Sequence, residues 1–282
     1  MARTSQSWGL RTLKIGFMSL VGLSVAFPVY WMVITSFKPN SEIYQRNPTF
    51  YPQAPTLDAY VALMTPHGTR APFVATMGNS LIAAVGSTLV SVIIGIFAAY
   101  ALTRLRFRGR EAFSGLIFGC YVFPGILMFI PIYLMFQWLG ILDTFFGLII
   151  SYQIFGIPFA TWMLRSYFAT IPASLEDSAR IDGCNRLQSI IYVTLPLAAP
   201  GIAAATIFTF TAAWNEFLFA QVLLQKPQYQ TAQVALYSLL NGDSVAWNQL
   251  MGGSVLVSLP VIVLFFAAQR YIGSGLTAGA VK

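Results

Sequence analysis

The chain has 282 residues, of which 57% are hydrophobic and only 9% are charged, whereas a soluble globular domain carries about 25% charged residues. This composition excludes an ordinary soluble protein and indicates a polytopic membrane protein. The net charge of +7 reflects where the basic residues stand along the chain, and nucleic-acid binding is not needed to explain it.

Six stretches contain no charged residue and are long enough to cross a bilayer, which takes about 20 apolar residues. They are residues 15–37, 71–103, 112–142, 144–164, 187–215 and 244–269. We predict six transmembrane helices rather than a barrel, because barrel strands are segments of only about ten residues with alternating polarity. The first stretch exceeds the roughly 7–15 apolar residues of a signal peptide, so we expect it to be retained. The predicted fold is a single all-α membrane domain over residues 1–282.

Lysine and arginine are distributed unequally between the two sides of this arrangement. If the N-terminus lies in the cytoplasm, twelve of the 16 basic residues fall in cytoplasmic segments and four fall outside. This positive-inside pattern predicts that both termini are cytoplasmic. The cluster RLRFRGR at residues 104–110 could contact lipid headgroups or a partner, but we interpret its arginines mainly as anchors that set the orientation.

Two polar segments fall on the outer side. Residues 38–70 are rich in proline and polar residues, which predicts irregular structure with one short helix near Leu57–Met64. Residues 221–248 predict a second short helix around Thr231–Leu240. Both segments are therefore expected to add a short helix on the outer side, and the second helix is expected to be interfacial or periplasmic.

The predicted spans hold almost no ionisable side chains, whereas a secondary transporter or ion pump usually buries such groups at mid-membrane. Glu216, near the end of the fifth stretch, is the one acid in such a position, and we interpret it as an interfacial acid beside Trp214. None of the chain's lysines follows a glycine, so the Gly-Lys-Ser/Thr sequence of a phosphate-binding P-loop is absent. Any uphill transport must therefore be driven by another subunit.

One charged stretch, LEDSARIDGCNRLQSIIYVTLP at residues 175–196, separates the fourth and fifth spans. Ser174 is placed to cap a helix over Leu175–Asp182, and Gly183 is placed to end it, because glycine adopts the left-handed conformation readily. A helix of about eight residues is too short to be stable alone, so it needs a surface to rest on. An apolar strip for this purpose is offered by Leu175, Ser178 and Ala179. A segment lying on lipid headgroups and a docking element for a partner both fit these residues.

The residues after Gly183 continue with apolar side chains at helical spacing. Leu187, Ile190, Ile191 and Leu195 lead into the fifth span, and Pro196 lies one turn inside it. We expect that a partner pushing on the short helix would move the fifth span almost directly.

The charged stretch also carries a family resemblance. Asp177-Ser178-Ala179, then Gly183, Val193 and the pair Leu195-Pro196 resemble the EAA loop of the permease subunits of binding-protein-dependent ABC importers. Three further stretches agree, namely FAAYALTRLRFRGR after the second span, AAWNEFLFA after the fifth, and GLTAGAVK at the C-terminus. The resemblance covers Ile15–Lys282 and is close to the MalG-like carbohydrate permeases. It implies the type I importer permease fold, with a core region at residues 71–275 and a coupling loop at residues 172–196.

The resemblance implies that the short helix inserts into a cleft of a cytoplasmic ATPase subunit, with Asp177 in place of the usual glutamate. The implied ATPase-coupling residues are Leu175, Glu176, Asp177, Ser178, Ala179, Arg180, Ile181, Asp182, Gly183, Leu195 and Pro196. The implied partners are a second, different permease subunit, two ATP-binding-cassette ATPase subunits, an extracytoplasmic solute-binding protein and membrane lipid. The chain itself is expected to be non-catalytic, to bind no cofactor or metal, and to lie in a bacterial or archaeal cytoplasmic membrane, with ATP and Mg on the ATPase subunits.

The implied cargo is a sugar, an oligosaccharide or a glycoside. Hydroxyl, amide and aromatic side chains of the later spans suit sugar recognition; the candidates for the substrate path are Asn79, Ser80, Tyr152, Gln153, Thr209, Thr211, Trp214 and Asn215. Such side chains also hold transmembrane helices together, so each has a structural alternative. The alternative functions are an importer for a polyol or a glycerophosphate, an ATP-independent facilitator, and a scaffold that transports nothing.

Overall fold

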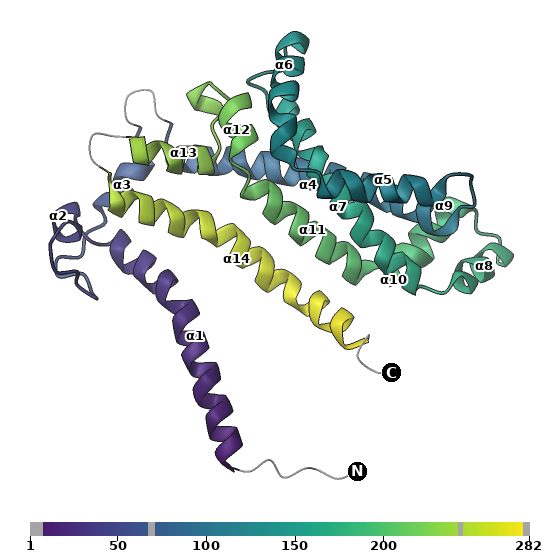
Figure 1. Ribbon diagram of the computed structural model, residues 1–282, viewed down its shortest axis with the longest axis horizontal. Helices are drawn as coiled ribbons and strands as arrows, with labels where there is room; N and C mark the ends of the chain where they lie inside the picture. The colour runs from purple at the N-terminus through teal and green to yellow at the C-terminus, as the bar shows by residue number, and fades with distance from the viewer. Residues whose placement is uncertain (1–7, 67–70, 242–244, 279–282) are drawn as a thin grey trace. The chain divides into compact units, whose positions relative to one another are not determined.

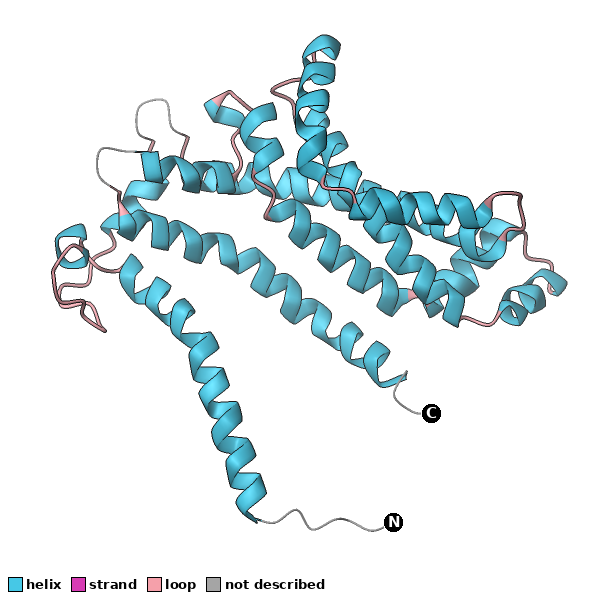
Figure 2. Ribbon diagram, viewed as in Figure 1, coloured by secondary structure: helices cyan, strands magenta, loops and turns pink. Residues whose placement is uncertain are grey.

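A computed structural model describes residues 8–66, 71–241 and 245–278 of the chain. Over these ranges the chain consists of helices and connecting segments, and no strand is present (Figure 2). The all-α prediction is therefore confirmed for the described residues. The C-terminal stretch GLTAGAVK, which contributed to the family resemblance, ends outside them.

The candidate membrane spans are of two kinds. Four helical segments are long and apolar enough to cross a bilayer, namely Arg11–Ser36, Phe73–Arg104, Phe145–Thr170 and Trp247–Ala267. Two further candidates are helix pairs bent at a short break, by 88° between Arg110–Val122 and Gly125–Leu139 and by 78° between Arg186–Leu197 and Ala199–Trp214. By length and composition, the described residues thus provide four candidate spans, or up to six if each bent pair crosses as one.

The two bent pairs lie in the apolar stretches 112–142 and 187–215, whose prolines predict kinks in the spans. Pro124 stands at the first break, and Pro200 follows the second. Proline lacks the N–H group that a helix interior needs, and its ring clashes with the preceding turn. The apolar length is visible in the sequence, but the direction that the backbone takes after the break is not.

The described residues form two compact units, the first drawn from Met1–Pro66 and Leu236–Leu256 and the second from His67–Ala235 and Val257–Lys282. The first unit contains α1 (Trp8–Ser36), α2 (Asn40–Ile43), α3 (Asp58–Met64), η4 (Leu239–Asn241) and the first turns of α14 (Trp247–Ala278). The second contains α4 (Phe73–Arg104), α5 (Arg110–Val122), η1 (Gly125–Met128), α6 (Phe129–Leu139), α7 (Phe145–Thr170), α8 (Ala173–Ile181), α9 (Arg186–Ser189), the π-helix η2 (Ile190–Thr194), α10 (Leu195–Leu197), α11 (Ala199–Trp214), α12 (Leu218–Leu223) and η3 (Pro227–Tyr229). Along the chain, α13 (Ala232–Ser238) begins in the second unit and ends in the first. The two predicted short helices are confirmed as α3 and as α13 with η4, while their location on the outer side stays a prediction.

A buried ion pair organises the polar segment of the first unit. Nζ of Lys38 lies 3.9 Å from Oε1 of Glu42 and 5.1 Å from the centre of the Trp31 ring. The Thr49 hydroxyl donates to Glu42 Oε1 at 2.5 Å, and the backbone N–H of Gln53 donates to Glu42 Oε2 at 3.1 Å. These hydrogen bonds, that of Thr49 first, hold the pKa of Glu42 below its usual range. The charged carboxylate therefore ties residues 38–53 into one arrangement.

Small residues let the long helices of the second unit approach one another closely. α4, α7 and α11 lie side by side (Figure 1). A Cβ added at Gly95 of α4 would lie 2.9 Å from the Cβ of Ala160 of α7, and one added at Gly156 of α7 would lie 2.2 Å from the Ser91 hydroxyl oxygen of α4. Contacts between small residues are typical of helix packing in membranes, and here they fix α4 against α7.

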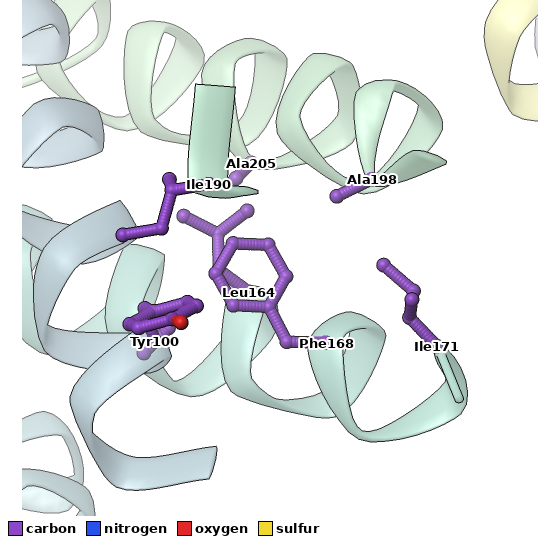
Figure 3. Packing of buried hydrophobic residues seen from close by; sticks show 8 residues of the cluster. Tyr100, Leu164, Phe168, Ile171, Ile190, Ala198 and Ala205 are labelled. Carbon is purple, nitrogen blue, oxygen red and sulfur yellow. The ribbon is translucent and has the colours of Figure 1, made fainter. Parts of the chain in front are cut away.

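An apolar cluster closes one end of this bundle. Its buried members are Ala99, Tyr100, Leu164, Phe168, Ile171, Ile190, Ala198 and Ala205. The side chains come from α4, α7, η2 and α11 and from the residues that follow α7 and precede α11, and they converge in Figure 3. The cluster therefore joins both halves of the bent pair around residue 198 to the α4–α7 packing.

Replacing Gly156 by alanine is expected to destabilise the second unit, because the new methyl group collides with Ser91 of α4. The expected loss is about 1–3 kcal/mol, as for overpacking of a tight core. Thermal unfolding of the detergent-solubilised protein measures it. Gly115→Ala on α5 is the matched control, since a Cβ there meets no atom within 4 Å. Equal stability of the two variants would contradict the close packing of α4 and α7.

Candidate functional site

The charged stretch forms α8, and the predicted cap of this helix is wrong. Helix α8 begins at Ala173, directly after Pro172, whose φ of −60° and ψ of 129° lead the extended chain into the helix without a capping side chain. Ser174 therefore lies inside the first turn, where its carbonyl oxygen accepts a hydrogen bond from the Ser178 hydroxyl at 3.0 Å. A proline can occupy this position because the N–H that it lacks has no partner at a helix start in any case.

The predicted end of the helix is confirmed. Gly183 has a φ of +93°, in the left-handed region that favours glycine. Its N–H donates to the Arg180 carbonyl at 3.2 Å, and the N–H of Cys184 donates to the Ala179 carbonyl at 3.0 Å. This pair of bonds is a Schellman motif, which satisfies the last carbonyl groups of α8 and reverses the chain.

After the turn the chain starts a separate short helix. Asn185 and Gln188 form a reciprocal capping box at the start of α9, and the π-helix η2 and α10 follow before the 78° bend into α11. The predicted fifth span thus contains a bend between Pro196 and Pro200, and the direct movement of this span by a push on α8 stays a prediction. A displacement along the axis of α9 and α10 would therefore point away from the axis of α11.

Helix α8 contacts the helix bundle mainly through one acidic side chain. Glu176 is the buried residue of α8, whereas Leu175 is 43% exposed and Ile181 is 86% exposed. The predicted apolar strip thus does not rest on the bundle, since Leu175 and Ser178 face outward and Ala179 is half-buried. These apolar groups remain available to a partner.

Glu176 sits in a set of contacts that we call the clasp, made by Tyr100, Arg104, Ile171, Glu176 and Thr194. Oε1 of Glu176 accepts from Arg104 Nε at 2.7 Å and from the Thr194 hydroxyl at 3.0 Å, and Oε2 accepts from the Tyr100 hydroxyl at 3.0 Å. Arg104 Nη2 also donates to the Ile171 carbonyl at 2.7 Å. A charge-assisted pair of this kind is strong, and removing one partner of a buried pair typically destabilises a protein by about 3–5 kcal/mol.

The outward face of α8 and the turn after it form a shallow hollow. It is lined by Asp177, Arg180, Ile181, Cys184, Asn185 and Arg186. One exposed apolar side chain next to two guanidinium groups and a carboxylate suits a protein surface that offers an apolar recess and acidic groups. The arrangement can dock a partner, and the described residues of the hollow contain no set of groups that could hold a metal ion.

A second candidate site is a pocket of about 440 Å³ between α5, α7 and α11. The Phe159 ring lies 5.7 Å from that of Tyr121 and 6.0 Å from that of Phe208, and all three line the pocket. The buried Thr209 hydroxyl, also in the lining, has no hydrogen-bond partner among the described residues. Glu216 completes the polar part of the wall. Aromatic faces beside a free hydroxyl and a carboxylate can bind a polyhydroxylated molecule.

Comparison with known proteins identifies the family. Residues 91–277 match the family model described as the inner membrane component of binding-protein-dependent transport systems. The chain belongs to this family. It is 41% identical to the inner membrane ABC transporter permease protein YcjP of Escherichia coli (strain K12), with 96% of this chain and 98% of the relative covered. It is 35% identical to the diacetylchitobiose uptake system permease protein DasC of Streptomyces coelicolor, with 98% and 96% covered.

A solved structure resembles the permease over nearly its whole length. This is the crystal structure of a bacterial ABC transporter involved in the import of the acidic polysaccharide alginate; the TM-score is 0.76 at 27% identity, and 96% of this chain and 98% of the other are covered. The resemblance to carbohydrate ABC importer permeases drawn from the sequence is thereby confirmed. The permease is a non-catalytic, multi-pass subunit of the cytoplasmic membrane, and ATP hydrolysis in this family belongs to a partner ATPase.

Most of the predicted path residues hold helices of the permease together. Asn79 donates from Nδ2 to the carbonyls of Gln228 and Gln230, both at 2.9 Å, and the Ser80 hydroxyl accepts from the Ala232 N–H at 2.8 Å. These bonds fasten α4 to the segment around η3 and α13.

The candidates on α7 and α11 are also bonded within the permease. Gln153 accepts from Ser91 at 2.6 Å, Trp214 donates from Nε1 to the Val257 carbonyl at 3.1 Å, and the Thr211 hydroxyl donates to the Ile207 carbonyl at 2.7 Å. Asn215 donates to the Thr211 carbonyl at 2.9 Å, and the buried Tyr152 hydroxyl bonds to Glu216.

Of the eight candidates, Thr209 lines the aromatic pocket directly, and Tyr152 holds Glu216, which also lines it. Sequence reasoning missed the rings of Tyr121, Phe159 and Phe208. The signal that could have found part of this wall is the aromatic pair Phe155 and Phe159 at i, i+4, which share one face of α7.

Replacing Gly183 by valine is expected to loosen α8, because a β-branched residue strains the left-handed conformation by about 1–3 kcal/mol. Hydrogen exchange should accelerate in residues 173–189 and remain unchanged in α4, as measured by mass spectrometry on the solubilised protein. Gly183→Asn is the matched control, since asparagine tolerates a positive φ better. A valine variant that exchanges no faster than the asparagine variant would contradict the role assigned to this turn.

Proposed function

We propose that this permease imports a sugar, an oligosaccharide or a glycoside as one of two different membrane-spanning subunits. In this proposal, two ATPase subunits that hold ATP and Mg drive it, and an extracytoplasmic solute-binding protein delivers the cargo. The single observation that carries the proposal is the construction of α8. The end of α8 and its one buried residue, Glu176, are fixed by contacts within this chain. The apolar side chains of α8 and the hollow face outward, where a partner can reach them.

The coupling loop of the proposal is residues 172–196, within a core region at residues 71–275. Ile181, 86% exposed, would enter an apolar recess of the ATPase, and Arg180 and Arg186 would meet acidic groups around it. Asp177, in the place of the family's usual glutamate, lines the same hollow. Gly183, Leu195 and Pro196 would act indirectly, by setting the position of α8 and of the segment after it.

The proposed cycle is alternating access. ATP draws the two ATPase subunits together, and the α8 helices of the two permease subunits follow them. The bundle then opens outward to receive the solute, and hydrolysis resets it. Nucleotide acts by binding one arrangement of the complex more tightly than the other.

We propose that the chain crosses the membrane six times with both termini in the cytoplasm. The positive-inside distribution supports this orientation. The two bent helix pairs support the number, since each has the length and composition of a span.

The proposed solute path passes the aromatic pocket. Sugar rings stack on aromatic faces while their hydroxyls require polar partners, and Phe159, Thr209 and Glu216 supply both kinds of group on one wall. The remaining path candidates, from Asn79 to Asn215, are proposed to shape the path by holding its helices. The diacetylchitobiose named for a relative at 35% identity supports a carbohydrate cargo.

The first test concerns ATPase docking. Ile181→Asp places a charge on the apolar contact, and we expect at least about a tenfold loss of ATPase subunits that copurify with the permease, as for a truncated hot spot. Phe107→Asp is the control, because Phe107 is an exposed apolar residue in the loop between α4 and α5. Unchanged recovery of the ATPase with Ile181→Asp, or solute uptake by proteoliposomes that contain this chain alone, would contradict the importer mechanism.

The second test concerns the pocket. Phe159→Ala removes the central ring, and we expect KM for solute uptake to rise by about tenfold, as for the loss of one buried aromatic contact of about 1.4 kcal/mol. Uptake is measured in proteoliposomes of the whole complex with a panel of labelled disaccharides, including diacetylchitobiose, and with a labelled glycerophosphate. Phe118→Ala, on the neighbouring helix and outside the pocket lining, serves as the control. Preference for the glycerophosphate, or equal KM in both variants, would count against a sugar path at this site.

A further inference from the structure

The connection between α8 and the rest of the permease is made through Glu176. Three hydrogen bonds join this carboxylate to α4 through Tyr100 and Arg104 and to η2 through Thr194. Arg104 in turn bonds to the carbonyl of Ile171, the residue that caps the end of α7. One carboxylate thus links α8 to α4, η2 and the end of α7.

The surroundings of the clasp keep water away from it. Glu176 is 5% exposed, and the ring of its partner Tyr100 lies in the apolar cluster with Phe168 and Ile190 (Figure 3). The Tyr100 hydroxyl bonds to Glu176. A charge pair in such a place cannot exchange its partners for water without leaving a buried charge unpaired. The clasp is therefore rigid compared with an exposed ion pair.

The peptide connections of α8 are less suited to transmit a displacement. On its C-terminal side, Gly183 turns the chain with a φ of +93°, and α9 begins with its own capping box. The following segment then bends by 78° before α11. A displacement of α8 that passed only along the backbone would be absorbed at the turn and at the bend.

We infer that Glu176 is a positioning residue that makes α8, the cytoplasmic end of α4 and η2 move as one body, so that ATPase motion enters the helix bundle through α4. This inference rests on the proposed function, because it takes α8 as the element on which the ATPase acts. Helix α11 is then moved through its packing on α4 and α7, and not along the bent backbone after α10. In this arrangement the ATPase moves α4 and α7 first, and α11 follows.

The test measures distances in the assembled complex, with Cys120 and Cys184 replaced by serine. Spin labels are placed at Ala173 on α8 and at Arg106 just after α4, both exposed positions. We expect the distance between the labels to be the same without nucleotide and with ATP bound. In Glu176→Gln we expect the distribution to broaden and to change when ATP binds.

A second readout separates positioning from stability. For the labelled sugar that the wild-type complex imports fastest, we expect Glu176→Gln to lower the number of molecules imported per ATP hydrolysed by about tenfold, since one partner of a buried pair is lost. Assembly with the ATPase should be retained. Glu111→Gln is the control, because Glu111 is an acid on α5 whose side chain is 70% exposed. It should leave both the distances and this ratio unchanged.

Milder variants keep the inference testable if Glu176→Gln fails to assemble. Tyr100→Phe and Thr194→Val each remove one hydrogen bond and leave the Arg104–Glu176 pair intact, and both should lower the transport ratio to an intermediate value. A label distance that changes with ATP in the wild-type complex, or a ratio unaffected by all three variants, would overturn the inference. Failure of the proposed function looks different, because the wild-type complex itself would then show no ATP-dependent uptake.

Discussion

The position of α8 on the helix bundle depends on one buried carboxylate, which needs hydrogen-bond partners. A lone charge cannot remain in apolar surroundings, so Glu176 holds Arg104, Tyr100 and Thr194 at hydrogen-bond distance. Helix α8 has no other buried residue. Its position therefore follows from electrostatics and hydrogen bonding, whereas the bundle beneath it is positioned by packing.

That bundle provides the rigid surface that the carboxylate requires. Glycine, alanine and serine at the α4–α7 contact bring the two backbones close together, and the apolar cluster seals the end where the clasp forms. The proline-bearing bends, in contrast, interrupt two of the apolar stretches. Rigid pairs of helices separated by bends are the arrangement in which a small displacement at one end can be converted into a change of direction elsewhere.

Sequence reasoning succeeded where the signal is local. The end of α8 at Gly183 and the short helices α3 and α13 follow from turn chemistry and from short-range patterns. It failed where a distant partner decides the outcome. Glu176 and Arg104 are separated by 72 residues, so nothing near Glu176 indicates that it faces inward. The same applies to the rings of the pocket, which three separate helices bring together.

The shallow attachment of α8 has a consequence for the evolution of importers. Because a single inward-facing side chain holds the helix, the residues on its other faces can be exchanged without disturbing the interior of the permease. If α8 docks on an ATPase as proposed, the fit depends on a few outward positions such as Asp177, Arg180 and Ile181, which line the hollow. A permease built in this way can acquire a new motor, or share one with other permeases, through a few surface substitutions.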